Sequence, residues 1–515
     1  MAGVVSWPTL TVRIATSVPV DAFTLDDATE GRFANPPTIP GYVLGDTFGK
    51  EWSDITDYVR SDAGVVINRG SSRQQGPYFV FESGQLSLSL DDRSGDFDPL
   101  NLNGPYVVAN VSQLIPGLPI TVSATHAGTE FVLFTGYVDA WNKTYPGEGN
   151  TDSVVQVRAS DPAAYLEKAS PNESAPEGAG EYVHDRLGRL LDAASWPAEL
   201  RDIDDRGAFT MAATTTSTET WSEMQASATS CNGYLFVSVD GTVVYRDRSS
   251  FPVLNDLTFG EGLDVPVVDL ELANDWDQIY NLVKLKRTDG VEQAVRDDTS
   301  VARFGMRSWS RSDLLVDNDN QVGESAEIIL SQAKDQRLRM DAVSVELDDT
   351  YRDDQWSGML SIELLHRIGS TILTTDGRSV SNDGLVRGIE VSVQPYRWRW
   401  KLSTVAAPER GGNFTLNDAA LGLLADWTSE QRQLIASWYE WLVSNLGQAS
   451  ADTVWAYGIQ SDVLSGLDFA SYLVAAQNFS PAAAQTARLT WQDTLGLTYA
   501  QWTATEYDYP TLALF

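Results

Sequence analysis

Short segments in which apolar and polar residues alternate recur through most of the chain. In QLSLSL, Leu86, Leu88 and Leu90 alternate with polar residues. Further along, Trp398 and Trp400 alternate with charged residues. A period of two places alternate side chains on opposite faces of a β-strand. We therefore predict a mainly β protein whose strands each bury one face.

The chain is long enough for several domains. At 515 residues it exceeds what one hydrophobic core normally organises. The stretch SPNESAPEGAG is rich in Pro, Gly, Ser and Glu, which is typical of a linker. We predict five parts: an all-β domain over 1–168, the linker over 169–180, a small α+β domain over 181–250, a second β-rich domain with one inserted helix over 251–405, and a Trp-rich, partly helical extension over 406–515.

Two helices and a hairpin are predicted in the α+β domain. Asp240 and Gly241 separate two β-prone arms in YLFVSVDGTVVYRDR, and Asp-Gly suits the positive φ angles of a two-residue hairpin turn. Apolar residues recur at helical spacing in two stripes, Val183, Leu187, Leu190, Leu191 and Ala194, then Trp221, Met224, Ala228 and Cys231.

Two further helices are predicted downstream. In the extension, Thr428 and Gln431 fit a capping box before a helix that contains Trp438 and Trp441. The single helix within 251–405 is predicted from one apolar stripe, formed by Ala326, Ile329, Leu330, Ala333 and Met340.

Two nine-residue segments are similar to each other. FTLDDATEG at Phe23–Gly31 recurs as FTLNDAALG at Phe414–Gly422. Both peptides could dock into equivalent grooves on neighbouring subunits, or both could be one common strand-and-turn solution. The sequence leaves the two interpretations open.

The charge of the chain is strongly negative. It contains 71 Asp and Glu against 36 Lys and Arg, giving a net charge of −35. Binding to a phosphate backbone requires an excess of Lys and Arg, so specific nucleic-acid binding is disfavoured. The acidic surface favours solubility, and it would also suit a channel through which DNA passes without adhering.

Cysteine usage and hydropathy indicate assembly in a reducing cytoplasm. Cys231 is the only cysteine, so no intrachain disulfide and no CxxC pair can form. The first residues do not resemble a secretory signal, and no run of about 18 apolar residues would insert into a membrane.

Few residues point to catalysis or to a cofactor. His126, His184 and His366 are the only histidines, and none belongs to an HExxH motif. No GxSxG elbow and no phosphate-binding loop occurs. We predict a non-enzymatic protein with no catalytic, cofactor-binding or metal-binding residues.

One acidic turn is a candidate cation site. Asp91, Asp92, Asp96 and Asp98 offer the carboxylate oxygens that calcium prefers, although their spacing departs from an EF-hand loop. A turn between two strands explains the same residues without a metal. The sixteen tryptophans raise a parallel choice between a sugar-stacking platform and core anchors, and the alternation of Trp398 and Trp400 favours core anchors.

An ordered series of segments points to a protein family. It comprises EWSDITDYVRS, INRGSSRQQGPYFVFESGQLSLSLDDRSGDFDPLNLNGPY, PGLPITVSA, FTGYVDAW and VRASDPAAYL, and it continues with DQIYNLVKLKR and VRGIEVSVQPYRWRWKL. In this order the segments resemble minor tail proteins of long-tailed actinobacterial phages, the group that includes tail hub proteins. The resemblance covers most of residues 20–405.

The resemblance implies a fold and a role. Such hubs resemble the baseplate hub of contractile tails, so the implied fold class is mainly β with α+β: two β-barrel-like domains flanking a small α+β domain, followed by the helical C-terminal extension. The implied role is a homotrimeric structural component of the virion tail tip, assembled in the host bacterial cytoplasm and taking part in host attachment and DNA ejection. The implied partners are the distal tail protein ring, the tape measure protein and other minor tail or receptor-binding proteins.

Several points stay open at the level of sequence. A trimer is not separated from a hexamer, and the host, the receptor and the partner of the extension are not specified. The alternative function is a carbohydrate-binding or carbohydrate-cleaving β protein at the host cell surface.

Overall fold

The structure is a computed structural model, and all of its described residues belong to one unit, Met1–Glu409. The described residues are 7–17 and 50–406, except for short gaps at 72–76, 78–79, 109, 146–151, 172, 174, 206, 208, 216–218, 249–253, 261–264, 274–275, 277, 337–338, 349 and 374–378. The predicted helical extension and both nine-residue segments lie outside the described residues.

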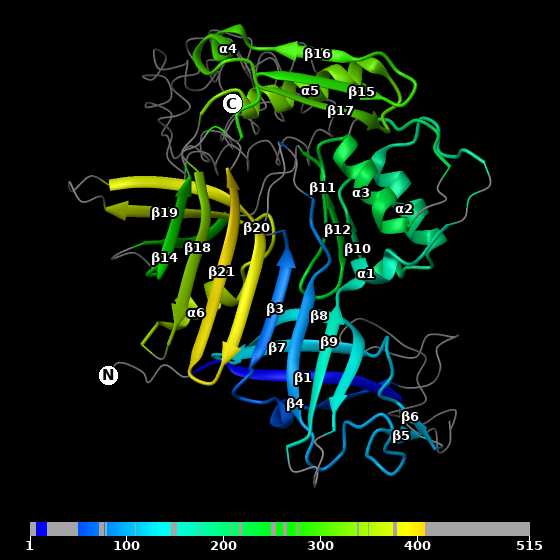
Figure 1. Cartoon of the computed structure of the whole chain (residues 1–515), viewed down its shortest axis with the longest axis vertical. Helices are drawn as coiled ribbons and strands as arrows, with labels where there is room; N and C mark the ends of the chain where they lie inside the picture. The colour runs from blue at the N-terminus through cyan, green and yellow to red at the C-terminus, as the bar shows by residue number, and fades with distance from the viewer. Residues whose placement is uncertain are drawn as a thin grey trace, which may run out of the picture. The chain divides into compact units, whose positions relative to one another are not determined.

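The described chain is mainly β, which confirms the predicted fold class. Its largest sheet has thirteen strands in the order β14-β18-β21-β20-β3-β4-β9-β8-β7-β1-β2, with β19 pairing β20 and β13 pairing β19 (Figure 1). The bounds are β1 Thr9–Ser17, β2 Lys50–Asp54, β3 Val65–Gly70, β4 Gln85–Asp91, β7 Pro119–His126, β8 Thr129–Thr144, β9 Val154–Ser160, β13 Leu254–Phe259, β14 Asp269–Ala273, β18 Arg339–Leu347, β19 Arg367–Leu373, β20 Ser379–Gln394 and β21 Arg397–Ala406.

Alternation of side chains sets which faces of this sheet are buried. Leu86, Leu88 and Leu90 are almost fully buried, as their period of two predicts. Trp398 and Trp400 are buried as well, and each lies edge-on to Trp356 of helix α6, Asp353–Leu360. The prediction that Trp398 and Trp400 are core anchors is therefore confirmed.

Two parts of the sheet repeat the same strand path. The first half-sheet runs β3-β4-β9-β8-β7, and the second runs β14-β18-β21-β20-β19. In each path the strands occur along the chain in the same order, because β3 and β14 come first, β4 and β18 second, and β7, β8, β9 and β19, β20, β21 follow. The next strand differs, since β1 pairs antiparallel with β7 whereas β13 pairs parallel with β19.

The α+β region has the two helices that the sequence predicts. They are α2, Val183–Ala193, and α3, Thr220–Ser230, which pack with a small sheet in the order β10-β12-β11. The other elements here are α1 Pro162–Leu166, η2 Ala198–Leu200, β10 Arg201–Ile203, β11 Tyr234–Val237 and β12 Val243–Arg246.

The hairpin between β11 and β12 forms, but its turn is longer than predicted. The Ser238 N–H donates to the Thr242 carbonyl at 2.9 Å, which leaves a three-residue loop. Gly241 has φ +86°, whereas Asp240 is not among the positive-φ residues. The Asp240 carboxylate accepts a hydrogen bond from the Thr242 N–H at 3.1 Å, so this side chain supports the loop without a left-handed backbone.

The segment predicted as a linker is held by backbone pairing. The Ala169 carbonyl accepts from the Thr220 N–H at 2.8 Å, and Glu177 forms a β-bridge with Thr214. The Gly180 N–H donates to the Met211 carbonyl. Backbone groups of residues 210–220 therefore fix this Pro- and Gly-rich segment in place.

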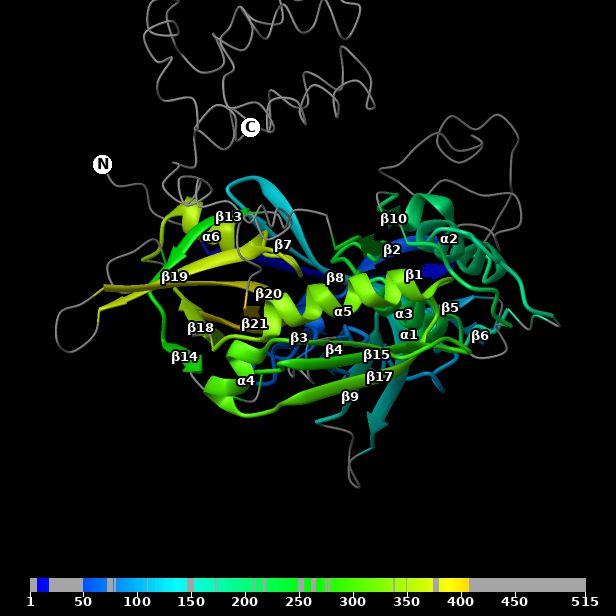
Figure 2. The same cartoon turned by 90° about the horizontal axis from the view of Figure 1, so that it is seen from above.

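The sequence predicts one helix between residues 251 and 405, whereas the described residues of this range form three: α4 Asp298–Phe304, α5 Asp319–Ala333 and α6. Helix α5 contacts β15 and β16 of the sheet β16-β15-β17, and Figure 2 shows it lying along β15 and β17. Met340, which the sequence assigned to the apolar stripe of this helix, lies in β18 instead. It is a buried residue of that strand whose position matches the helical spacing only by coincidence. The remaining bounds are β15 Leu282–Arg287, β16 Gln293–Arg296, β17 Ser308–Leu314, η1 Thr56–Tyr58, β5 Val107–Val108 and β6 Val111–Ser112.

Candidate functional site

The two half-sheets are joined by one strand pair, β3 with β20, which we call the join. The pairing is antiparallel, with Val65 opposite Val393 and Gly70 opposite Gly388 (Figure 1). Val65 and Ile67 are fully buried there, and Val391 and Val393 are each 4% exposed. The strands assigned by sequence to the domains 1–168 and 251–405 therefore form one continuous sheet.

A bulge in β20 closes one end of the join. The register between β20 and β21 shifts between Val386 and Gly388, and Arg387 lies at the shift. The Ser71 N–H donates to the Arg387 carbonyl at 2.7 Å, while Arg387 Nη1 donates to the Ser71 carbonyl at 3.0 Å. Burial lowers the pKa of Arg387 from its usual value. The backbone and guanidinium of Arg387 thus both hydrogen-bond to Ser71, the residue that follows β3.

Arg69 ties the join to the α+β region. Its Nη2 lies 2.7 Å from Glu363 Oε1 and donates to the Val237 carbonyl, also at 2.7 Å. Glu363 Oε2 accepts in turn from the Val239 N–H at 2.9 Å. This network is almost fully buried at Arg69, whose side chain is 4% exposed. A buried ion pair is weak evidence for added stability, but its hydrogen bonds connect β3 to the hairpin between β11 and β12.

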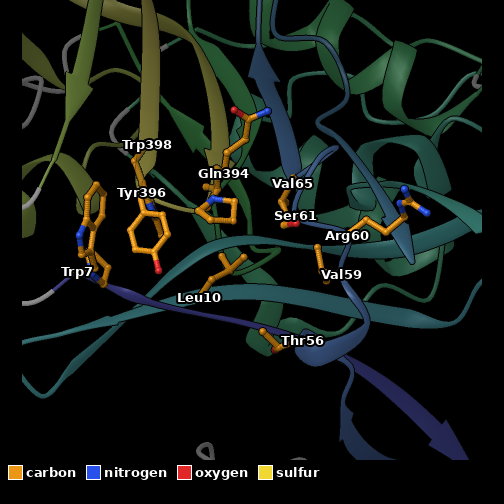
Figure 3. Close-up of a pocket in the computed structure, with 14 residues that line it drawn as sticks. Trp7, Leu10, Thr56, Val59, Arg60, Ser61, Val65, Gln394, Tyr396 and Trp398 are labelled. Carbon is orange, nitrogen blue, oxygen red and sulfur yellow. The ribbon is translucent and has the colours of Figure 1, made fainter. Parts of the chain in front are cut away.

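A pocket of about 290 Å³ lies at the end of the join where Val65 pairs with Val393 (Figure 3). It is lined by Trp7 before β1, by Arg60 and its neighbours before β3, and by Tyr396 in the β20–β21 turn. Tyr396 is 81% exposed, and its ring lies 6.0 Å from that of Trp7. Arg60 is held by both carboxylate oxygens of Asp62, whose pKa this hydrogen bonding lowers to about 2. Arg60, the charged side chain in the pocket lining, is therefore already paired with Asp62.

The acidic turn contains an ammonium group. Lys143 Nζ of β8 lies 2.6 Å from Asp92 Oδ2 and 3.0 Å from Asp98 Oδ2, and the Asp92 side chain is fully buried. Asp91 pairs with Arg93, and Asp96 accepts from the Ser94 hydroxyl at 2.7 Å. Among the described residues, no group of three or more His, Cys, Asp or Glu could hold a metal ion. In this structure Lys143 supplies the positive charge that a cation would bring.

The three histidines have different partners. His126 Nε2 lies 3.0 Å from Asp353 Oδ1, His184 stacks on Tyr182, and His366 Nδ1 accepts from the Glu363 N–H at 3.2 Å. Burial lowers the pKa of His366.

Cys231 is buried among apolar residues, and that burial raises the pKa of its thiol to about 12. Its Sγ lies 3.7 Å from Met211 Sδ. Such a thiol is poorly suited to nucleophilic or redox chemistry.

No helix within the described ranges is long and apolar enough to cross a membrane.

The two half-sheets agree residue by residue around their central strands. Val138 N–H donates to the Leu118 carbonyl at 2.8 Å, and Val386 N–H donates to the His366 carbonyl at 2.9 Å. Every partner in the second bond follows its counterpart by 248 positions. The bulge after Val138 likewise matches the bulge after Val386, since Ala140 and Gly388 resume the pairing.

This duplication was missed in the sequence analysis. The segments GYVDAW, from Gly136, and GLVRGI, from Gly384, carry a short signal of it, because glycine and valine recur at the same spacing. Two identities in six residues are too few to detect without the pairing registers. The sequence did predict a β-rich domain on each side of the α+β domain, over 1–168 and 251–405.

Among the described strands, β14 has one edge without a partner strand, and β8 lacks a partner along the last part of the edge that β7 covers further back. At the join β3 covers residues 388–393 of β20, but among the described strands none covers the equivalent residues 140–145, of which 140–144 belong to β8. Likewise β3 has β4 and β20 as neighbours, whereas its counterpart β14 pairs only with β18. Unpaired strand edges are natural places for another strand to add.

Comparisons with solved structures find tail proteins. The tail protein from Neisseria meningitidis MC58 is 13% identical with a TM-score of 0.48, covering 78% of this chain and 97% of that chain. The prophage MuSo2 43 kDa tail protein from Shewanella oneidensis is 14% identical with a TM-score of 0.46, covering 67% and 94%. Prophage tail protein gp18 from Listeria monocytogenes EGD-e is 9% identical with a TM-score of 0.40, covering 70% and 94%.

No protein-family model matches the chain, and no curated protein matches it. With identities this low, the function of this chain has to be inferred from its own residues and geometry.

Proposed function

We propose that this chain is a structural, non-enzymatic subunit of a phage tail tip, and that three copies form a ring that closes the tail tube. The ordered series of segments that resembles tail hub proteins supports a position at the tip of the tail tube. The single structural observation that carries the proposal is the duplicated half-sheet with a continuous join. Three chains of two similar half-sheets each would make a ring of six.

The ring would connect the tube to its neighbours in the tail. Its partners would be the distal tail protein ring, the tape measure protein, and other minor tail or receptor-binding proteins. The domain limits 1–168, 169–180, 181–250, 251–405 and 406–515 are kept as part of this proposal, with the extension as a docking segment. The net charge of −35 per chain would make the ring strongly acidic and would disfavour adhesion of DNA.

Electron cryomicroscopy of the intact particle tests this function. We expect three copies of the chain in one ring at the tip of the tail tube. Absence of the chain from purified particles, or a single peripheral copy, would reject the proposal. When the gene for this chain is deleted, the phage should produce particles with incompletely assembled tails.

A further inference from the structure

We propose that the outer edge of β14 pairs with residues 140–145, which are the end of β8 and the residue after it, in a second copy of this chain, in the register by which β3 pairs with β20 inside one copy. The inference rests on the proposed ring and names the contact that would build it. In Figure 1, β14 lies at the margin of the sheet beside β18.

The registers of the two half-sheets define equivalent residues. In the first, a row across the strands runs Val66, Ser87, Arg158 and Ala140. In the second, the same row runs Glu271, Ala342, Ser403 and Gly388. Glu271 of β14 is thus the counterpart of Val66 of β3, and its neighbour Leu270 is the counterpart of Val65.

The same equivalence identifies the facing strand. Ser392 of β20 stands opposite Val66 at the join, and the residue 248 positions before it is Thr144 of β8. Val393, opposite Val65, corresponds to Tyr145. The inferred contact therefore places Glu271 of one copy opposite Thr144 of the next, and Leu270 opposite Tyr145.

Side chains at the two free edges are exposed where their counterparts at the join are buried. Val65 is fully buried and Val393 is 4% exposed, but Leu270 is half-buried and Tyr145 is 55% exposed. Adding the second copy would give these apolar side chains the cover that the join provides, at about 25 cal/mol per Å² removed from water.

Further apolar side chains flank both edges. Val268 and Trp276, on either side of β14, are each 62% exposed. Ile115 is 51% exposed, and its carbonyl accepts from Trp141 Nε1 of β8 at 3.2 Å, which places it beside the other edge. Clusters of exposed large apolar residues of this kind mark interaction surfaces.

The contact is head-to-tail. Each copy offers one β14 edge and one β8 edge, and these edges differ, so the same contact can repeat from copy to copy and close into a ring. Pairing of β14 with a second β14 about a two-fold axis would instead stop at a dimer. The duplicated path favours the first arrangement, because the join already realises it within one chain.

A designed disulfide tests the register in the full chain. Opposite residues of paired strands have Cα atoms about 4.5–5.5 Å apart, within the range that a disulfide spans. Glu271 and Thr144 are both exposed, whereas the native Cys231 is buried and the pKa of its thiol is raised by that burial. The double variant Glu271→Cys with Thr144→Cys should lose its monomer band on a non-reducing gel and gain a covalent trimer.

Controls separate this inference from the proposed function. Each single variant should remain monomeric on the gel, and the off-register pair Glu271→Cys with Asn142→Cys, on the same face two residues away, should stay largely uncrosslinked. Crosslinking of Glu271→Cys alone would overturn the inference in favour of a two-fold contact. A trimer seen by native mass spectrometry without crosslinking of the double variant would overturn the register and leave the ring intact, whereas a monomer in that measurement would overturn both.

Discussion

Lys143 pairs with two aspartates of the acidic turn in a largely buried site. Its side chain is 4% exposed, Asp92 is fully buried, and Asp98 is 14% exposed. Burial alone would lower the pKa of Lys143, but hydrogen bonds to Asp92 and Asp98 outweigh that effect and raise it. The ammonium group is therefore a structural part of the turn.

Removing this ammonium group should strongly destabilise the protein. In Lys143→Met, Asp92 would be a buried charge without its partner, and we expect the free energy of unfolding to fall by about 3–5 kcal/mol. Urea unfolding measures the change. The control Arg93→Met removes an exposed pair with Asp91 in the same turn and should cost about 0–1 kcal/mol. Equal losses in the two variants would contradict this account.

Asp98 should make the stability of the turn depend on pH. Burial raises the pKa of Asp98, but hydrogen bonds from the Leu100 N–H, Lys143 and Tyr145 outweigh burial and lower it. A carboxyl group with a lowered folded pKa stabilises the fold above its unfolded pKa of about 3.9, and that contribution is lost as pH falls through the folded pKa. The stability difference between the wild type and Asp98→Asn should be constant near neutral pH and shrink below about pH 4. A difference that grows on acidification would have the wrong sign.

At the scale of elements, the join depends on a close backbone approach. Gly70 ends β3 with φ +78°, and an added Cβ would meet the Arg387 carbonyl oxygen at 2.3 Å. Gly117 has a similar φ of +88° with nothing within 4 Å. The two glycines separate steric contact at the join from the intrinsic cost of a left-handed backbone.

Alanine at Gly70 should therefore disturb the join. Both Gly70→Ala and Gly117→Ala carry a left-handed backbone cost of about 1–2 kcal/mol, but only the first also pushes β3 away from β20. We expect Gly70→Ala to lose more stability in urea unfolding and to speed hydrogen exchange in β3 and β20. Equal losses without faster exchange would argue against a tightly packed join.

Local pattern predicted the elements better than their partners. The alternation around Leu88 identified a strand and its buried face, and apolar spacing identified α2 and α3. Pairing of β3 with β20 joins residues more than 300 positions apart, and a period of two carries no information on which strand lies alongside. Lys143 was missed for the same reason, because 51 residues separate it from Asp92.

At the scale of the whole molecule, charge opposes assembly. Each chain carries a net charge of −35, so identical copies repel each other. Screening shortens the Debye length from about 30 Å at 0.01 M salt to about 8 Å at 0.15 M. Sedimentation should show tighter association of the copies as salt is raised over this range. Weaker association at higher salt would mean that attractive ion pairs, and not strand edges and apolar contacts, hold the ring together.

The number of chains in the assembled protein bears most directly on the ring. Each chain has a mass of 56.4 kDa, and native mass spectrometry of the purified full-length protein should find a species of three times that mass. A species of one chain at every concentration tested would contradict the account.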